Sequence, residues 1–326
     1  MATFAEIKKR LSVPVIGAPL FIVSNPKLVI AQCKAGIVGS FPSLNARPAE
    51  ALDDWIVEIK EALAAHDAAH PDRPSAPYAV NQIVHRSNDR LMKDMEACVR
   101  HKVPIVICSL GAREDVYQAI HSYGGLVLHD IINNTFARKA IDKGADGLIA
   151  VAAGAGGHAG VISPFALVSE IREWFSGPVA LSGSIATGGA VLAAEAMGAD
   201  FGYIGSPFIA TDEANASDGY KDAIVQHSAD DIVYTNLFTG VHGNYLKPSI
   251  VAAGLDPDNL AEGDLSTMNF GSGGNTAAKA WKDIWGCGQG IGAIKAREGA
   301  GAYVARLSRE YSEARARLMP SATLLR

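Results

Sequence analysis

Eight short apolar runs, separated by longer segments of helical character, constrain the fold of this chain more than any other feature. The runs are rich in Val and Ile and lie at residues 13–20, 36–41, 78–83, 103–110, 125–131, 146–153, 178–185 and 201–208. Strands that alternate with helical segments are typical of stacked βα units with a parallel sheet. Eight such units predict an α/β fold of the closed (β/α)8 type, the TIM barrel.

The segments between the runs carry the expected helix signals. After the first run, Asn25 can cap a helix whose first turn contains Pro26. Several runs are continuously apolar, as expected for strands that are covered by helices outside and by packed side chains inside. An open doubly wound sheet is the alternative architecture. That fold usually carries G-x-G-x-x-G after its first strand, whereas GAPLFIVSNP follows here.

The alternation stops after residue 208. Residues 212–285 mix helical patches with stretches rich in Gly, Asn, Pro and Ser, and they are too long for an ordinary loop. We expect a mainly helical addition over the barrel mouth, near the active site. Residues 286–326 contain an amphipathic pattern that predicts a closing helix packed on the barrel. The predicted division is therefore a barrel at 1–211, the addition at 212–285 and the closing segment at 286–326.

Charge and composition exclude several classes of partner. The formal net charge is −5 and the basic residues are scattered, so nucleic acid is not an expected partner. The N-terminus lacks the pattern of a signal peptide, and no apolar run is long enough to span a bilayer, so we expect a cytoplasmic protein. The four cysteines are widely spaced and form no C-x-x-C pair, so no metal site is predicted. The sequence leaves the oligomeric state open and is compatible with a homodimer.

The ends of the strands limit the chemistry, because barrel enzymes place their reacting groups there. The fifth strand ends in His129 and Asp130, and Asp130 is the only acidic residue among the strand ends, which contain no Lys. An aldolase would need a Lys, a glycosidase two carboxylates and a metal hydrolase several ligands. A bound organic cofactor can supply chemistry that such side chains cannot. We take His129 and Asp130 as candidate cofactor contacts.

Glycine and serine follow the seventh and eighth strands. Gly183 and Ser184 precede a helix that starts near residues 187–189, and Gly205 and Ser206 follow the eighth strand. Backbone N–H groups in such loops, together with a helix start, can bind a phosphate. The alternative is that these residues only form turns. Their joint occurrence at the usual phosphate position of this fold favours an anion site.

A single histidine stands in a glycine-rich turn after the sixth strand. The turn spans residues 154–160 and places His158 at the barrel mouth, on the side of the predicted phosphate loops. A structural role is the alternative for a lone histidine. Its position favours proton abstraction from carbon, or hydrogen bonding to a developing anion, near the natural pKa of imidazole.

Several segments together resemble one family of barrel enzymes. They are GAPLFIVSNPKLVIAQCKAGIVGSF near the start, AGGHAG at 155–160, PVALSGSIATGGAVLAAEAMGAD leading to YIGSPFIAT, and the late WGCGQGIGAIK. They resemble the nitronate monooxygenases, formerly called 2-nitropropane dioxygenases, which are FMN-binding barrels.

The resemblance implies roles for individual residues. Ala18, Pro19 and Leu20 match the turn that lies against the flavin ring, and Asn81 matches an Asn at the ring edge. Gly156 and Gly157 match backbone beside the flavin, the pairs Gly183–Ser184 and Gly205–Ser206 match the phosphate loops, and His158 matches the catalytic histidine. The implied reaction is the oxidation of alkyl nitronates by FMN and O2 to a carbonyl compound and nitrite.

Other functions remain open at this stage. Similar barrels include NAD(P)H-dependent quinone reductases and FMN-dependent enoyl reductases. A non-catalytic barrel that binds a phosphate ligand is a further alternative. A phosphosugar isomerase or aldolase would use the same phosphate loops but lacks its acid and base residues here.

Overall fold

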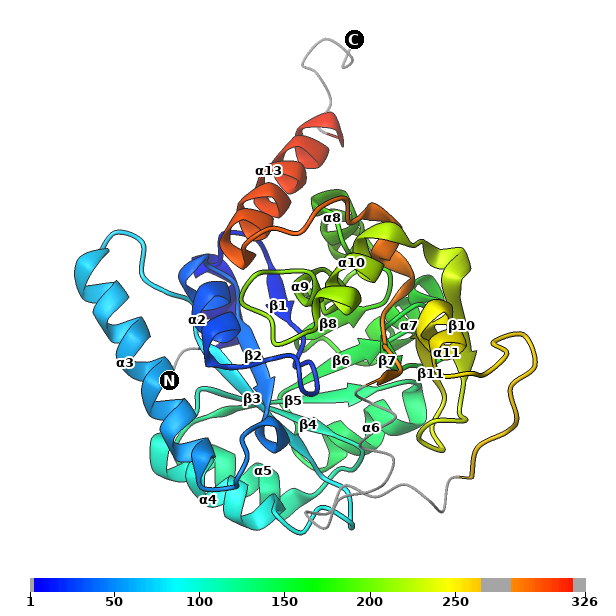
Figure 1. Ribbon diagram of the computed structural model, residues 1–326. Coiled ribbons are helices and arrows are strands. Elements are labelled where there is room, and N and C mark those ends of the chain that lie inside the picture. The colour runs from blue at the N-terminus through cyan, green and yellow to red at the C-terminus, as the bar shows by residue number, and fades with distance from the viewer. Residues whose placement is uncertain (1–2, 265–282, 319–326) are drawn as a thin grey trace.

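The chain folds into a closed barrel of eight parallel strands, seen end-on in Figure 1. The computed structural model describes residues 3–264 and 283–318. The strands are β1 (Val15–Gly17), β2 (Gly39–Pro42), β3 (Tyr78–Ile83), β4 (Ile105–Ser109), β5 (Leu126–Ile131), β6 (Gly147–Val151), β8 (Val179–Ser182) and β9 (Phe201–Ile204). Each pairs with its neighbour in the order β1-β9-β8-β6-β5-β4-β3-β2. A parallel bridge between Ile16 and Val38 joins the two ends of this order. The predicted (β/α)8 barrel is confirmed.

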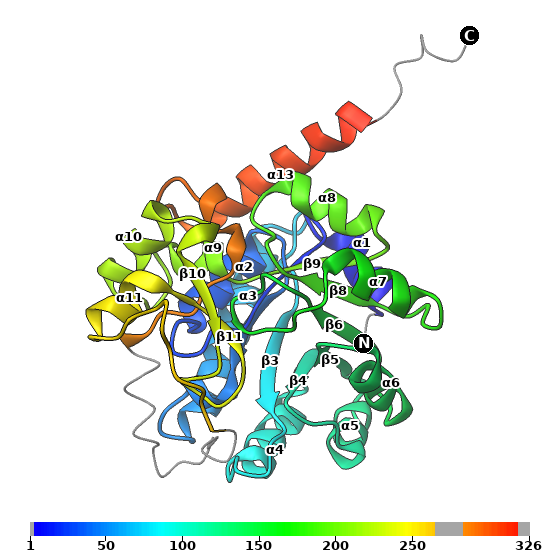
Figure 2. The ribbon, with the colours of Figure 1, turned by 90° about the vertical axis from the view of Figure 1, so that its right-hand side faces the viewer.

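Side chains from alternate strand positions fill the inside of the barrel. They form a buried cluster that includes Ile105, Ile107, Leu128 and Ile149. The N-terminal helix α1 (Phe4–Arg10) adds Phe4, whose ring meets Phe201 edge-on with centroids 6.3 Å apart. In Figure 2, α1 and the helices of the added segment lie on opposite sides of the barrel. One end of the barrel is thus closed by α1, and the other end is available for a site.

Helices surround the strands. They are α2 (Pro26–Lys34), α3 (Ala51–Ala69), α4 (Leu91–His101), α5 (Glu114–His121), α6 (Asn134–Asp142), α7 (Pro164–Arg172) and α8 (Gly188–Ala196), and the short α9 (Ser206–Ile209) follows β9. The side chain of Asn25 accepts a hydrogen bond from Leu28 N, so it caps α2 as predicted. The last helix, α13 (Ala300–Leu318), contacts both α8 and α2 and takes the outer position between them. Among the helices of residues 3–264 and 283–318, none combines the length and the apolarity needed to cross a membrane.

The segment between α9 and α13 contains strands as well as helices. Its elements are α10 (Asp218–Gln226), the 3-10 turn η2 (Ala229–Asp231), β10 (Ile232–Thr235), β11 (Gly243–Leu246), α11 (Lys247–Ala252) and η4 (Gln289–Ala293). β10 and β11 form an antiparallel hairpin, and β11 also pairs with β7 (Gly157–His158) in the turn after β6. This hairpin was not foreseen in the segment predicted to be mainly helical, whose residues 265–282 lie outside the described ones. The three-part division of the chain stays a prediction.

Candidate active site

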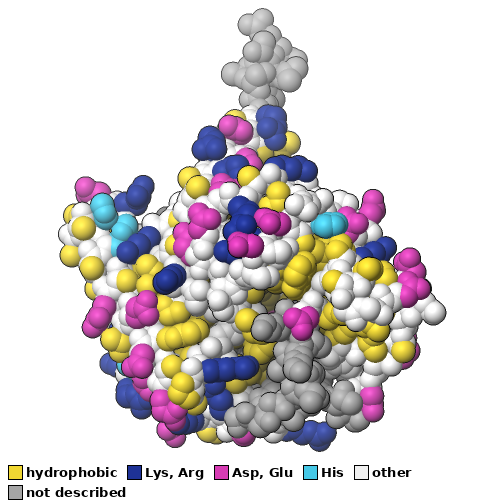
Figure 3. All heavy atoms as spheres, viewed as in Figure 1, with side chains coloured by type: hydrophobic (Ala, Val, Ile, Leu, Met, Phe, Trp, Pro, Cys, Tyr) yellow, Lys and Arg dark blue, Asp and Glu magenta, His cyan; other side chains and the backbone are white. Residues whose placement is uncertain are grey.

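A large cavity opens at the carboxyl ends of the barrel strands. Its volume is about 1710 Å³, whereas small-molecule sites commonly measure about 300–1,000 Å³. Its walls come from the loops after β1, β3, β5, β6, β8 and β9, and from the added segment. In Figure 3, which looks at the barrel along the direction of Figure 1, hydrophobic side chains gather around the middle of the face. The cavity therefore has room for a cofactor and a substrate together.

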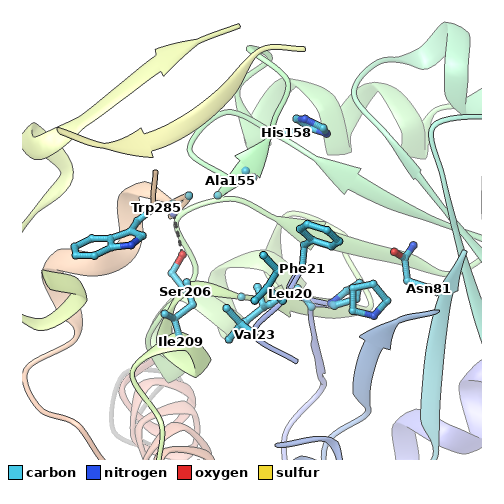
Figure 4. Close-up of a pocket in the computed structure, with 18 of the residues that line it drawn as sticks. Leu20, Phe21, Val23, Asn81, Ala155, His158, Ser206, Ile209 and Trp285 are labelled. Carbon is cyan, nitrogen blue, oxygen red and sulfur yellow. Dashed lines mark hydrogen bonds between the residues drawn. The ribbon is translucent and has the colours of Figure 1, made fainter. Parts of the chain in front are cut away.

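All the predicted site residues except His129 line this cavity. They are Ala18, Pro19, Leu20, Asn81, Asp130, Gly156, Gly157, His158, Gly183, Ser184, Gly205 and Ser206. Figure 4 shows His158 and Asn81 toward one end, and Ser206 and Trp285 toward the other. The barrel thus brings together residues that are up to 188 positions apart, from Ala18 to Ser206.

His129 does not line the cavity, unlike the other residues predicted to contact the cofactor. Successive strand residues point to opposite faces of a sheet, so His129 and Asp130 cannot both point inward. The His129 ring is buried, and its Nδ1 lies 2.8 Å from the hydroxyl of Tyr117 on α5. Burial lowers the pKa of His129 to about 4, so the ring is neutral at neutral pH. It packs the strand against its helix.

Asp130 lines the cavity beside a polar wall that includes Asn81. Burial raises the pKa of Asp130 to about 6, while hydrogen bonds from the Ser109 side chain and Leu110 N act in the opposite direction. Asn81 Nδ2 donates to Ser109 Oγ at 2.8 Å and to Ile107 O at 3.1 Å. Ser109 also lines the cavity, and the sequence analysis missed it. This wall offers a carboxyl group that titrates close to neutral pH.

His158 is half-buried at the edge of the cavity and is held by the hairpin. Its backbone pairs with Gly243, and its ring Nε2 lies 3.0 Å from Thr239 Oγ1. Burial lowers the pKa of His158 to about 4. The imidazole is therefore neutral at neutral pH and can accept a proton.

The glycines of the turn before His158 are required by backbone conformation at Gly157 and by close packing at Gly156. Gly157 has φ of +64°, a conformation that favours glycine. A Cβ on Gly156 would lie 2.7 Å from Gly288 N, and one on Gly288 would lie 2.6 Å from Gly154 O. The turn therefore packs directly against residues 286–290, backbone against backbone.

This late segment is part of the cavity wall. The sequence analysis placed residues 212–285 near the active site but did not predict that residues 286–290 line it. Trp285, Gly286, Gly288 and Gly290 line the cavity. The ring of Trp285 stacks on that of Tyr220, with centroids 5.1 Å apart. A glycine at every second position from 286 to 292 was the available signal, since such spacing marks close backbone approach.

The two predicted phosphate loops lie at the ends of the neighbouring strands β8 and β9. Gly183 has φ of +135°, and a Cβ there would lie 2.7 Å from Ala153 O. The next residue, Ser184, also has positive φ, which is uncommon without glycine and often marks a functional site. Ser206 Oγ accepts a hydrogen bond from Gly288 N at 2.8 Å, drawn in Figure 4. Its hydroxyl proton is left to donate elsewhere.

The start of helix α8 does not contribute to the cavity, contrary to the sequence-based expectation. Gly188 N donates to the Glu310 carboxylate of α13 at 2.9 Å, and Ala190 N donates to Thr187 Oγ1. A Cβ on Gly188 would overlap the backbone of α13. This end of α8 is capped and covered by the last helix, and Gly188 allows the close approach of the two helices.

Known proteins similar to this chain point to one family. The family model for nitronate monooxygenase matches residues 4–253. A nitronate monooxygenase from Paraburkholderia phytofirmans is 29% identical over 339 residues, which cover 92% of each chain. Nitroalkane oxidase from Streptomyces ansochromogenes superposes with a TM-score of 0.80 at 24% identity, covering 96% of this chain and 99% of that one.

A second solved structure has a similar fold but is described by a different activity. The enoyl reductase domain of MlnA from Bacillus amyloliquefaciens superposes with a TM-score of 0.69 at 15% identity, covering 95% of this chain and 98% of that one. At this identity, as for nitroalkane oxidase, the likeness concerns the fold alone. The choice of reaction has to come from the residues of the cavity.

Proposed function

Because this chain belongs to the nitronate monooxygenase family and is a flavin-dependent oxidoreductase, we propose that it oxidises alkyl nitronates with FMN and O2. The products would be a carbonyl compound and nitrite. The observation that carries this proposal is the neutral imidazole of His158 at the edge of a cavity lined by glycine-rich loops.

The loops of the cavity fit a cofactor that carries a phosphate. The phosphate would lie at Gly183–Ser184 and Gly205–Ser206. The Ser206 hydroxyl, which accepts from Gly288 N, would donate its proton to the phosphate, whereas the N–H of Ser184 already donates to Gly154 O. The ring would lie toward Ala18–Leu20 and Asn81. A Cβ on Gly205 would lie 3.1 Å from Leu20 Cδ2, so the β1 turn and the end of β9 border the same space. The chemistry that bound FMN supplies is the acceptance of electrons from the substrate and their transfer to O2.

His158 would act as a general base toward a nitroalkane. Its neutral ring takes the proton from the carbon that carries the nitro group, which leaves the nitronate in the cavity. A histidine with its pKa lowered to about 4 stays in the base form across the physiological range. Preformed nitronates would bypass this step.

The test is the identity of the released flavin together with product formation. Acid denaturation of the purified protein should release FMN, identified against FAD by chromatography. With nitroethane or its nitronate and O2, the protein should form nitrite, and His158→Asn should lower turnover of nitroethane more than turnover of the nitronate. A colourless protein that forms no nitrite from either compound would refute the proposal.

A flavin reductase that uses NAD(P)H is the second candidate. The cavity of about 1710 Å³ supports it, because that volume leaves room for a second ligand beside a flavin. Anaerobic mixing with NADH and with NADPH distinguishes the candidates, since rapid bleaching of the flavin favours the reductase.

A further inference from the structure

We propose that Asp130 binds the flavin ring as a neutral carboxylic acid and donates its proton in a hydrogen bond to an acceptor atom of the ring. This inference rests on the flavin of the proposed function and does not depend on the nitronate substrate. It adds a proton donor to the cavity wall and makes flavin binding depend on pH.

The register of the strands places Asp130 in one row with Ser109 and Asn81. Ile107 pairs with both Asn81 and Leu128, and it belongs with Leu128 to the cluster inside the barrel. Ser109 and Asp130 each lie two residues further along their strands, so their side chains point the same way, and both line the cavity. The three polar side chains therefore form a row across β3, β4 and β5, next to the apolar core of the barrel.

The hydrogen bonds of Asn81 fix the direction of the bonds along this row. Ile107 O can only accept, so the Asn81 atom that lies 3.1 Å from it is Nδ2. The same Nδ2 donates to Ser109 Oγ at 2.8 Å. Ser109 in turn directs its own hydroxyl proton at the Asp130 carboxylate. Because both amide protons of Asn81 are used on the wall, Asn81 can offer a ligand only its acceptor Oδ1. A ligand acceptor atom at this row therefore needs the proton of Asp130.

The turn after β4 supplies a second donor to Asp130. Leu110 N donates to the carboxylate. Leu110 has φ of +62°, which is uncommon without glycine and often marks a functional site. A Cβ on Gly111 would overlap Val84 O, so this turn is held against the chain that follows β3. A protonated carboxyl keeps a carbonyl oxygen with two acceptor positions, which can receive both bonds while its hydroxyl faces the cavity.

The surroundings of Asp130 carry no compensating charge in residues 3–264 and 283–318. Burial raises the pKa of Asp130 to about 6, and only the Ser109 side chain and Leu110 N oppose this rise. The titratable groups that face it from neighbouring elements are Cys108 on β4, Tyr117 on α5 and Tyr203 on β9. Burial raises the pKa of all three, so each is neutral at neutral pH. His129 and His158 are neutral as well, because burial lowers the pKa of each to about 4. A ligand that covers the Asp130 carboxyl removes its remaining water and favours the acid form further.

Binding of riboflavin tests this inference, because riboflavin carries the ring common to FMN and FAD and has no phosphate that titrates. Quenching of its fluorescence by the full chain, freed of flavin, measures the Kd. The acid form of the free Asp130 declines tenfold per pH unit above about pH 6, so the Kd should rise about thirtyfold between pH 7 and pH 8.5. Calorimetry at about pH 7.5, in two buffers of different ionisation enthalpy, should show the uptake of about one proton on binding.

Two variants provide the comparison. Asp130→Asn keeps the size of the side chain and offers an N–H donor that does not titrate. Its Kd for riboflavin should stay constant over the same pH range, with no proton uptake. Asp89→Asn is the matched control, since Asp89 also lines the cavity but is exposed. We expect this control to reproduce the pH dependence of the wild type.

The outcomes separate this inference from the proposed function. A wild-type Kd that does not change with pH, an equal pH dependence in Asp130→Asn, or no riboflavin binding at any pH overturns the role of Asp130. A protein that binds riboflavin with the expected pH dependence but forms no nitrite refutes the proposed reaction alone.

Discussion

Replacing Gly188 with Ala should loosen the last helix from the barrel. The added methyl would lie 2.6 Å from the carbonyl carbon of Glu310, and nearer still to Tyr311 N and Leu307 O. Carbon atoms pack at about 3.5–4.0 Å, so α13 would have to move by roughly 1 Å or more. The clash involves backbone atoms, which cannot swing aside as a side chain could.

The cost follows from what this movement disturbs. It stretches the bond between Gly188 N and the Glu310 carboxylate, now 2.9 Å, and disrupts the packing of the buried residues Tyr303 and Leu307. Overpacking of this kind costs about 1–3 kcal/mol. For a chain of this size, the midpoint of thermal unfolding should drop by roughly 1–4 °C.

The adjacent glycine provides a control in the same helix. A Cβ on Gly189 would come no closer than 3.9 Å to Ala314 Cβ. Since Ala is favoured over Gly in a helix by about 0.5–1 kcal/mol, Gly189→Ala should be neutral or slightly stabilising. Thermal unfolding of both apoproteins and titration of each with FMN form the assay.

Two results would refute this reasoning. Equal unfolding midpoints for Gly188→Ala and Gly189→Ala would show that α13 does not press on Gly188. Loss of FMN affinity in both variants, with both apoproteins as stable as the wild type, would show that this helix start belongs to the phosphate site after all.

Three further predictions concern the cavity. The pKa of His158 is lowered to about 4, so its neutral base form exists above that pH. We therefore expect kcat/KM for nitroethane to fall only below about pH 5. An acid limb near the usual histidine pKa of about 6.5 would contradict this. The raised pKa of Asp130, about 6 against 3.8, means that its contribution to stability is complete below pH 3.8 and is lost as the pH rises through 6. The apoprotein of Asp130→Asn should therefore gain thermal stability relative to the wild type across that window, and a constant difference would argue against it. Gly156→Ala would push on Gly288 N and should lower the fraction of protein that holds flavin at a given flavin concentration. Gly301→Ala, whose added Cβ meets nothing within 4 Å, should leave that fraction unchanged. Absorbance of the bound flavin measures both.

The strands could be predicted because their signal is local. Seven of the eight apolar runs contain a whole barrel strand, and β2 extends to Pro42, one residue past its run. The runs extend beyond the strands where the following turn is also apolar. Residues 13–20, for example, contain β1 at Val15–Gly17 and then Ala18–Leu20, which line the cavity. Barrel strands are buried on both faces, by helices outside and by packed side chains inside, so they are apolar throughout. A continuously apolar strand does not reveal which of its residues point into the barrel and which point outward. For this reason His129 was placed in the site beside Asp130.

The glycines show where local reasoning stops. Gly183 and Gly188 both follow β8 and both stand beside small polar residues, so sequence reasoning predicts the same phosphate-binding role for both. The structure separates them, because the partner of Gly188 is Glu310, which lies 122 positions later. A contact of that separation leaves no pattern in a single sequence.

We expect the chemistry and the selectivity of this chain to come from different parts of it. The family model matches residues 4–253, which include His158 and both predicted phosphate loops. Asp283, Trp285 and Gly288 line the same cavity and lie after the matched range. Gly288 packs against the His158 turn and donates a hydrogen bond to Ser206, so a change at Gly288 would disturb the predicted phosphate loop. A change at Asp283 or Trp285 would alter the cavity wall and leave those backbone contacts in place. Substrate choice in this protein should therefore follow Asp283 and Trp285, and exchanging these two side chains for those of relatives should move substrate preference while flavin content stays constant.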